Sequence, residues 1–168
     1  VSLDGFEEHH FHIRQNRESF ARAVEAVRMI SADKELASDV VTCVTPALLP
    51  RLGEFKEFLY GLGVRHWRVF TIFPVGRAAQ DSSLQLNNEE FTYLMQFIDD
   101  SCREGRISVS YGCEGFLGGY ELKARKSPFE CHAGLSVASI RVNGDISGCT
   151  SVRANFTQGN IYRDNFWD

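Results

Sequence analysis

The sequence predicts an α/β protein with a parallel sheet covered by helices, and two observations predict it. Short β-branched or apolar runs alternate with longer segments that carry apolar residues at helical spacing. The connections between successive runs are long enough for the helical crossovers that parallel strands require. From Lys123 onward this alternation gives way to loop and hairpin patterns. We therefore expect an α/β domain over residues 1–122 and an appendage of different architecture over residues 123–168.

Strands and helices alternate along the predicted domain. The expected strands are the runs at residues 1–3, 39–44, 64–73 and 107–111, and the third of them reads as apolar on both faces. The expected helices carry apolar residues three or four positions apart and cover residues 19–30, 50–63 and 87–105. These segments make up the predicted sheet and its cover.

Residues at the helix ends support these boundaries. Asn87, followed three residues later by Glu90, predicts a capping box at the start of the third helix. Gly61 or Gly63 is expected to end the second helix, and Gly105 the third. The local sequence thus specifies where the helices stop as well as which face is apolar.

Ligands of parallel α/β proteins gather at the carboxyl ends of the strands. The segments that directly follow the expected strands are residues 4–5, 45–46, 74–78 and 112–115. Each is a candidate site loop. Cys113, in the last of them, is a candidate to face an active site, and its role stays open.

Composition excludes several classes of function. The net charge is -4, and Lys and Arg are scattered, so the sequence gives no basic footprint for nucleic acid. No apolar run reaches the roughly 18 to 20 residues of a membrane span, and the first residues do not resemble a signal peptide. We expect a cytoplasmic protein. The chain opens on Val1 inside an apolar run, which predicts a piece of a longer protein.

The five cysteines are too few, too scattered and odd in number for a disulfide framework. Cys43 lies within a predicted strand and Cys102 on a helical stripe, so both are expected in the core. The histidines at 9, 10 and 12 have no fitting carboxylate or thiol nearby in the sequence, so a solvated loop is preferred there to a zinc cluster.

Two cysteines flank an alternating segment with an Asn143-Gly144 turn, which predicts a type I′ hairpin. The expected pairs are Val142 with Asp145, Ile140 with Ser147, and Ala138 with Cys149. Cys131 then approaches Cys149 if residues 132–136 curl back. The two sulfurs would share one metal centre, although the chemistry alone leaves buried thiols as an alternative.

The spacing Cys131-x(12)-Gly144-x(4)-Cys149, followed by QGNIYRDNFW at 158–167, resembles the opening half of the SPASM or twitch extension of radical SAM enzymes. VSLDG at 1–5, followed by HFHIR at 10–14 and SFARAVEAVRMI at 19–30, is similar to the family's fourth strand and the helix that follows it. FPVGRA at 73–78 is similar to the end of its sixth strand. The resemblance implies the later half of a partial (β/α)6 TIM-like barrel, followed by a SPASM/twitch β-hairpin.

The resemblance also implies site residues. Ser2 and Asp4 would lie by the ribose of S-adenosylmethionine, and Arg14 would meet its methionine carboxylate. The residues expected to border the adenine are Phe73, Pro74, Gly76 and Arg77. Phe11 and Gln15 stand where the family has aspartate and glycine in His-Asp-x-x-Arg-Gly.

The same resemblance implies metal ligands. Cys131 and Cys149 would be two ligands of an auxiliary [4Fe-4S] cluster, whose remaining ligands would lie beyond Asp168. The family's first [4Fe-4S] cluster sits on a Cys-x3-Cys-x2-Cys motif, which this chain lacks.

The implied activity is that of a radical SAM oxidoreductase similar to coenzyme PQQ synthesis proteins. The intact enzyme would form a 5′-deoxyadenosyl radical and modify a peptide or small protein; no catalytic side chain is assigned. Thr150 follows the second cysteine where sulfatase maturases carry aspartate, which disfavours that activity. The isolated chain is expected to be inactive and to self-associate through an unpaired sheet edge.

Two alternatives from other classes stay open. One is a non-catalytic α/β binding module, which needs the strand-end loops but no cluster. The other is a zinc-stabilised interaction domain that uses Cys131 and Cys149 with a histidine such as His132.

Overall fold

The computed structural model describes residues 1–112, 115–149 and 156–165. The chain divides into two compact units, Val1–Phe129 and Glu130–Asp168. The sequence predicted this division at residue 122. The difference arises at Glu121, whose carboxylate accepts hydrogen bonds from the Leu117 and Phe129 backbone N–H groups and so joins the segment after residue 122 to the first unit.

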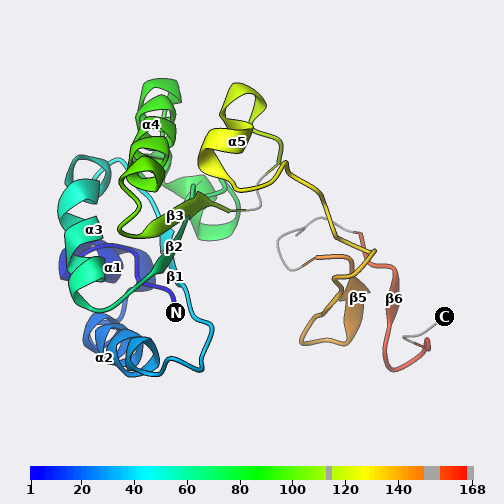
Figure 1. Ribbon diagram of the computed structural model, residues 1–168. Helices are drawn as coiled ribbons and strands as arrows, with labels where there is room; N and C mark the ends of the chain where they lie inside the picture. Colours follow the sequence, from blue (N-terminus) through cyan, green and yellow to red (C-terminus); the bar gives the residue numbers. More distant parts are fainter. Residues whose placement is uncertain (113–114, 150–155, 166–168) are drawn as a thin grey trace. The chain divides into compact units, whose positions relative to one another are not determined.

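A parallel sheet forms the centre of the first unit (Figure 1). Its strands are β1 (Val40–Cys43), β2 (His66–Phe70) and β3 (Ser108–Tyr111), in the order β1-β2-β3. The first predicted strand appears as a single parallel bridge between Ser2 and Val41, flanked by hydrogen bonds of 2.8 and 2.9 Å that join Val41 to Val1 and Leu3. The predicted α/β class with parallel strands is confirmed.

Five α-helices occur in the described residues: α1 (Glu7–Arg14), α2 (Ser19–Ala32), α3 (Leu52–Gly61), α4 (Asn88–Glu104) and α5 (Glu121–Ala124). Short 3-10 helices stand at η1 (Leu49–Arg51), η2 (Gly76–Gln80), η3 (Ser82–Leu84) and η4 (Gly118–Tyr120). At the start of α4, the side chain of Asn87 and that of Glu90 form the predicted capping box. Gly105 ends α4 in the left-handed conformation, also as predicted.

α1 overturns the prediction of a solvated loop around the three histidines. Glu7 and Glu8 lie in its first turn and Arg14 in its last, which complements the helix dipole. The residue that α1 buries is His10, so the helix lacks the apolar stripe by which sequence patterns reveal amphipathic helices.

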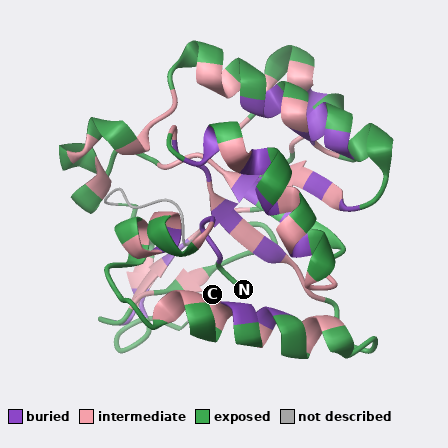
Figure 2. Ribbon diagram, turned by 90° about the vertical axis from the view of Figure 1, so that its left-hand side faces the viewer, coloured by how far each residue is buried: buried purple, intermediate pink, exposed green. Residues whose placement is uncertain are grey.

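The core lies on one face of the sheet, where buried strand residues meet α3 and α4 (Figure 2). The Trp67 ring packs edge-on against Phe55 of α3 and Phe97 of α4, with centroid distances of 5.7 and 5.9 Å. β2 alternates, however: His66 and Arg68 on its other face are exposed. The prediction that this strand is apolar on both faces was wrong, because helices cover only the face that carries Trp67.

The second unit contains an antiparallel sheet of β4 (Ser139–Ile140), β5 (Asp145–Ser147) and β6 (Gly159–Asn160), in that order. A hairpin joins β4 to β5, but Ile140 pairs with Ile146, one position away from the predicted register. The loop has three residues between Arg141 and Asp145, whose backbones bond at 2.8 Å. Only Gly144 of this loop has a positive φ, of 87°. The predicted type I′ turn, which needs two such residues, is therefore wrong.

None of the helices in the described part of the chain has the length and hydropathy needed to cross a membrane.

Candidate functional site

Asp4 lies immediately after the bridge that joins the N-terminal segment to β1, and its side chain is fully buried. One carboxylate oxygen, Oδ1, accepts the Cys43 backbone N–H at 3.0 Å. The other, Oδ2, accepts the Nε–H of Arg14 at 2.6 Å. The backbone N–H of Asp4 donates to His10 Nδ1 at 3.1 Å. Both oxygens and the backbone N–H of Asp4 are thus engaged within the protein.

Arg14 is the last residue of α1, and its side chain is 39% exposed. Asp4 holds its Nε, and within the described residues its two terminal nitrogens form no hydrogen bond or ion pair. A guanidinium held in this way keeps two parallel N–H groups for an anion, which suits a carboxylate. The site therefore presents an oriented cation at the carboxyl end of the sheet.

Gln15 directly follows Arg14 and has φ 56°, the only positive φ among the described residues other than glycine. Its side-chain amide donates to the His12 carbonyl at 2.7 Å, and its backbone N–H bonds to Phe11. The left-handed position that favours glycine is thus present although the residue is glutamine. α1 consequently ends with Arg14 in the last turn.

His10 is the buried member of the group. Its Nδ1 accepts a hydrogen bond, so the ring is neutral and carries its proton on Nε2. Burial lowers the pKa of His10 from its ordinary value of 6.5, the Asp4 charge opposes this shift, and the Arg14 charge adds to it. The sequence predicted this residue as part of a loop; the signal missed was its position four residues before Arg14 on one helix face.

The loop after β2 supplies an exposed apolar surface. The side chains of Phe73 and Val75 are 52% and 45% exposed, and Pro74 and Arg77 are exposed as well. Gly76, with φ 61°, begins η2.

This loop lies near the end of α1. Asp81, at the start of η3, has its Oδ2 3.7 Å from Nε2 of His12, two residues before Arg14. The structure therefore brings the predicted adenine loop and the predicted carboxylate-binding arginine to the same edge of the sheet. Ser2 is exposed beside Val41, two residues before Asp4.

The cysteine hairpin belongs to the second unit. Cys131 is exposed and Cys149 half-buried. The loop after Cys131 does curl back: a Cβ added to Gly148 would lie 3.2 Å from the Gly134 nitrogen, so the two backbone segments approach closely. In the described ranges no three His, Cys, Asp or Glu side chains form a group that could hold a metal ion. Two thiols are half the usual ligand set of a [4Fe-4S] cluster.

Neither of the two cysteines predicted to lie in the core is fully buried. Cys43 is half-buried in β1. Cys102 is exposed, and the prediction that it lies in the core was wrong: it sits in the last turn of α4, where its thiol donates to the Val109 carbonyl at 3.0 Å. Burial of the sulfur still raises the pKa of this thiol. Cys113 and Thr150 lie outside the described residues, as does Trp167 of the predicted motif.

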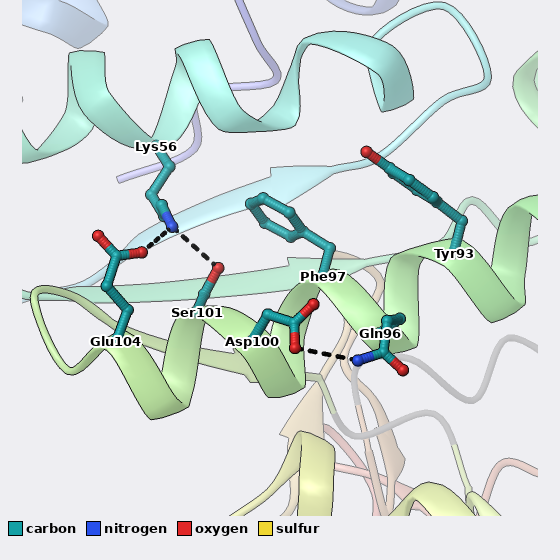
Figure 3. Close-up of a pocket in the computed structure, with 7 residues that line it drawn as sticks. All are labelled: Lys56, Tyr93, Gln96, Phe97, Asp100, Ser101 and Glu104. Carbon is teal, nitrogen blue, oxygen red and sulfur yellow. Dashed lines mark hydrogen bonds and ion pairs between the residues drawn. The ribbon is translucent and has the colours of Figure 1, made fainter.

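A shallow pocket lies elsewhere, between α3 and α4 (Figure 3). Lys56 of α3 reaches across to Ser101 and Glu104 of α4, and Tyr93, Phe97 and two polar side chains of α4 line the rest. None of the residues predicted to bind a ligand lines it. We therefore place the candidate site at the Asp4–Arg14 pair.

Comparison with known proteins gives a likeness in fold. No family model matches the chain, and no curated protein matches its sequence. Among solved structures, the fold is similar to that of SuiB from Streptococcus suis, crystallised with bound S-adenosylmethionine. The TM-score is 0.66 at 14% identity, and the match covers 99% of this chain and 40% of the SuiB chain. The likeness shows the fold, and the chain spans less than half the length of that neighbour.

Proposed function

We propose that this chain is part of a cytoplasmic radical SAM enzyme and that its Asp4–Arg14 pair binds S-adenosylmethionine. The observation that carries the proposal is the guanidinium of Arg14, held by a buried carboxylate at the strand ends of a fold like that of a protein bound to S-adenosylmethionine. The resemblance of the cysteine hairpin to the SPASM group adds a second, independent line of support.

The residues of the site fit the chemical parts of this ligand. The two terminal nitrogens of Arg14 match the methionine carboxylate bidentately. Phe73 and Pro74 offer exposed apolar surface for the adenine ring, and the backbone at Gly76 allows close approach. Ser2 is exposed and carries a hydroxyl that suits the ribose. Arg77, in the same loop, is proposed to border the adenine as well.

We propose a role for Asp4 that differs from the ribose contact implied by the sequence resemblance. Both of its carboxylate oxygens are engaged inside the protein, and its side chain is buried. We therefore propose that it positions Arg14. The ribose contact then falls to Ser2.

The iron-sulfur chemistry of the proposed enzyme needs residues outside this chain. A [4Fe-4S] cluster on a Cys-x3-Cys-x2-Cys motif outside this chain would supply the reducing electron for S-adenosylmethionine, and the substrate would be a peptide or small protein. Cys131 and Cys149 would supply two thiolates to an auxiliary cluster, and further ligands would have to complete it. The part assigned to this chain's barrel residues is to bind and orient the cofactor.

The test is the affinity of the full-length protein for S-adenosylmethionine, measured by calorimetry. Arg14→Ala removes a charge-assisted bidentate contact, which should cost about 1.5 to 3 kcal/mol, or roughly ten- to a hundredfold in Kd. Arg17→Ala is the matched control, because Arg17 is exposed and lies over the Phe11 ring instead of beside Asp4. Equal dissociation constants for Arg14→Ala and wild type would remove Arg14 from the site.

A further inference from the structure

The group around Asp4 contains a residue that the proposed function leaves without a task. His10 is 2% exposed, and its ring stands edge-on to Phe20 of α2, with a centroid distance of 6.1 Å. Its Nδ1 accepts the backbone N–H of Asp4 at 3.1 Å. The same nitrogen lies 3.7 Å from Asp4 Oδ2, the oxygen that accepts the Nε–H of Arg14.

We infer that His10 is a positioning residue for the anion site at Arg14 and that it does this only while neutral. The inference rests on the proposed function, because it assigns the anion to Arg14. As a neutral acceptor, His10 fixes the main chain of Asp4 and leaves Oδ2 to Arg14 alone. The orientation of the guanidinium then follows from Asp4, which α1 and β1 hold from two sides.

Protonation of His10 reverses both effects. A proton on Nδ1 faces the N–H of Asp4, so two donors meet where one hydrogen bond existed. The new positive charge lies 3.7 Å from the oxygen that Arg14 contacts, so two cations compete for one carboxylate oxygen. Arg14 loses its fixed orientation, and binding of an anion at its terminal nitrogens weakens.

The surroundings of His10 define the pH range of this effect. The charged groups that face it are Asp4 from the N-terminal segment and Arg14 from its own helix, while Phe20 from α2 is uncharged. Burial lowers the pKa of His10 below 6.5, so the ring is neutral above that pH. Affinity for the anion should therefore fall as the pH is lowered from 6.5 through the depressed pKa.

Two substitutions distinguish the effect of losing the hydrogen-bond acceptor of His10 from the effect of protonating its ring. His10→Asn keeps a side-chain oxygen close to the position of Nδ1 but has no proton to gain in this range. His10→Phe keeps an aromatic ring and removes the acceptor. His66→Phe is the control, because His66 is exposed at the start of β2. Thermal unfolding of each full-length variant establishes that it is folded.

The first measurement is the Kd for S-adenosylmethionine by calorimetry between pH 7.5 and 4.5. Wild type and His66→Phe should weaken together below pH 6.5, whereas His10→Asn should keep a flat profile. His10→Phe should bind about tenfold more weakly at pH 7.5, the order of effect that supporting hydrogen bonds have on a ligand site. His10→Asn should recover most of that loss. An unchanged Kd in folded His10→Phe, or a wild-type pH profile in His10→Asn, overturns the inference.

The second measurement needs no ligand and separates this inference from the proposed function. The Nε–H of Arg14, held by Asp4, should give a slowly exchanging NMR signal at pH 7.5 in the free protein. His10→Phe should broaden or shift it, and His10→Asn should restore it. If Arg14→Ala leaves cofactor binding intact but this signal responds, the proposed function fails while the coupling of His10 to Arg14 stands. An unchanged Arg14 signal in folded His10→Phe contradicts the coupling. If His10→Phe does not fold, the pH dependence of the signal decides: it should shift or broaden below pH 6.5 in wild type but not in His10→Asn, and equal pH profiles overturn the inference.

Discussion

At the scale of single residues, Asp4 organises the candidate site although it is itself out of reach of a ligand. A buried carboxylate is stabilising only when paired and hydrogen-bonded, and Asp4 obtains this from Arg14 and from the Cys43 backbone. Removal of either charge would leave the other uncompensated. The pair therefore ties the strand end to the last turn of α1.

Gly5, which follows Asp4, adopts a backbone conformation and a close packing that favour glycine. Its φ is 108°, and an added Cβ would lie 2.9 Å from both His9 Cβ and Leu48 Cδ1. Gly5→Ala should therefore lower the free energy of unfolding by about 2 kcal/mol or more, through strain and overpacking. Urea denaturation followed by circular dichroism measures this.

Gly61→Ala is the matched control for Gly5→Ala. Gly61 lies in α3 with nothing within 4 Å of the added Cβ. Alanine favours helix over glycine, so this variant should gain about 0.5 to 1 kcal/mol. Equal effects of the two substitutions would mean that Gly5 is not held in the left-handed region.

At the scale of elements, the capping box of α4 gives a direct test. The Asn87 side chain accepts the N–H groups of Glu89 and Glu90, so Asn87→Ala should cost about 1 kcal/mol of stability. Asn88→Ala, one position inside the helix and exposed, should be nearly neutral. Thermal melts of both variants check the difference, and equal losses would show that the cap contributes nothing.

Elements with local signals were predictable, and elements determined by distant contacts were not. The capping box and the helical stripe predicted α4 because both are encoded within a few residues. α1 was missed because its buried residue is His10, whose partner Asp4 lies in the preceding segment. The type of the hairpin turn was predicted wrongly because the turn packs against β6 and the residues after it. The Tyr162 ring would lie 2.6 Å from a Cβ added to Gly144, and the Asn160 side chain bonds to Asn143 and Asp145.

In the candidate site, too, the features with a local sequence signal were predictable and those set by distant contacts were not. Asp4 and Arg14 were each predicted as ligand contacts because the segments that carry them resemble two neighbouring motifs of one family, but their direct ion pair was not predicted. The approach of the loop after β2 to α1, seen at the His12–Asp81 contact, depends on the crossover through α2, β1 and α3, which no local pattern specifies. The proposed role of Asp4 in positioning Arg14 rests on the burial of its side chain, which no local sequence pattern specifies.

At the scale of the whole molecule, the parallel sheet ends in the N-terminal segment on one side and β3 on the other. In the described part of the chain no strand pairs with the outer edge of the N-terminal segment. Unpaired edges favour association between chains. The 168-residue chain should therefore form dimers or larger species in sedimentation equilibrium at micromolar concentration. A single 19.0 kDa species at all concentrations would contradict this.

The central claim, that this chain belongs to a radical SAM enzyme with an auxiliary cluster, is tested most directly by metal and sulfide analysis of the full-length protein purified without oxygen. The account predicts iron and acid-labile sulfide in about equal amounts, with iron falling by about one cluster in the Cys131→Ala, Cys149→Ala double variant while the α/β unit stays folded. Zinc in place of iron would indicate an interaction domain, and a protein without metal would indicate an α/β binding module. Either of these results would contradict the account.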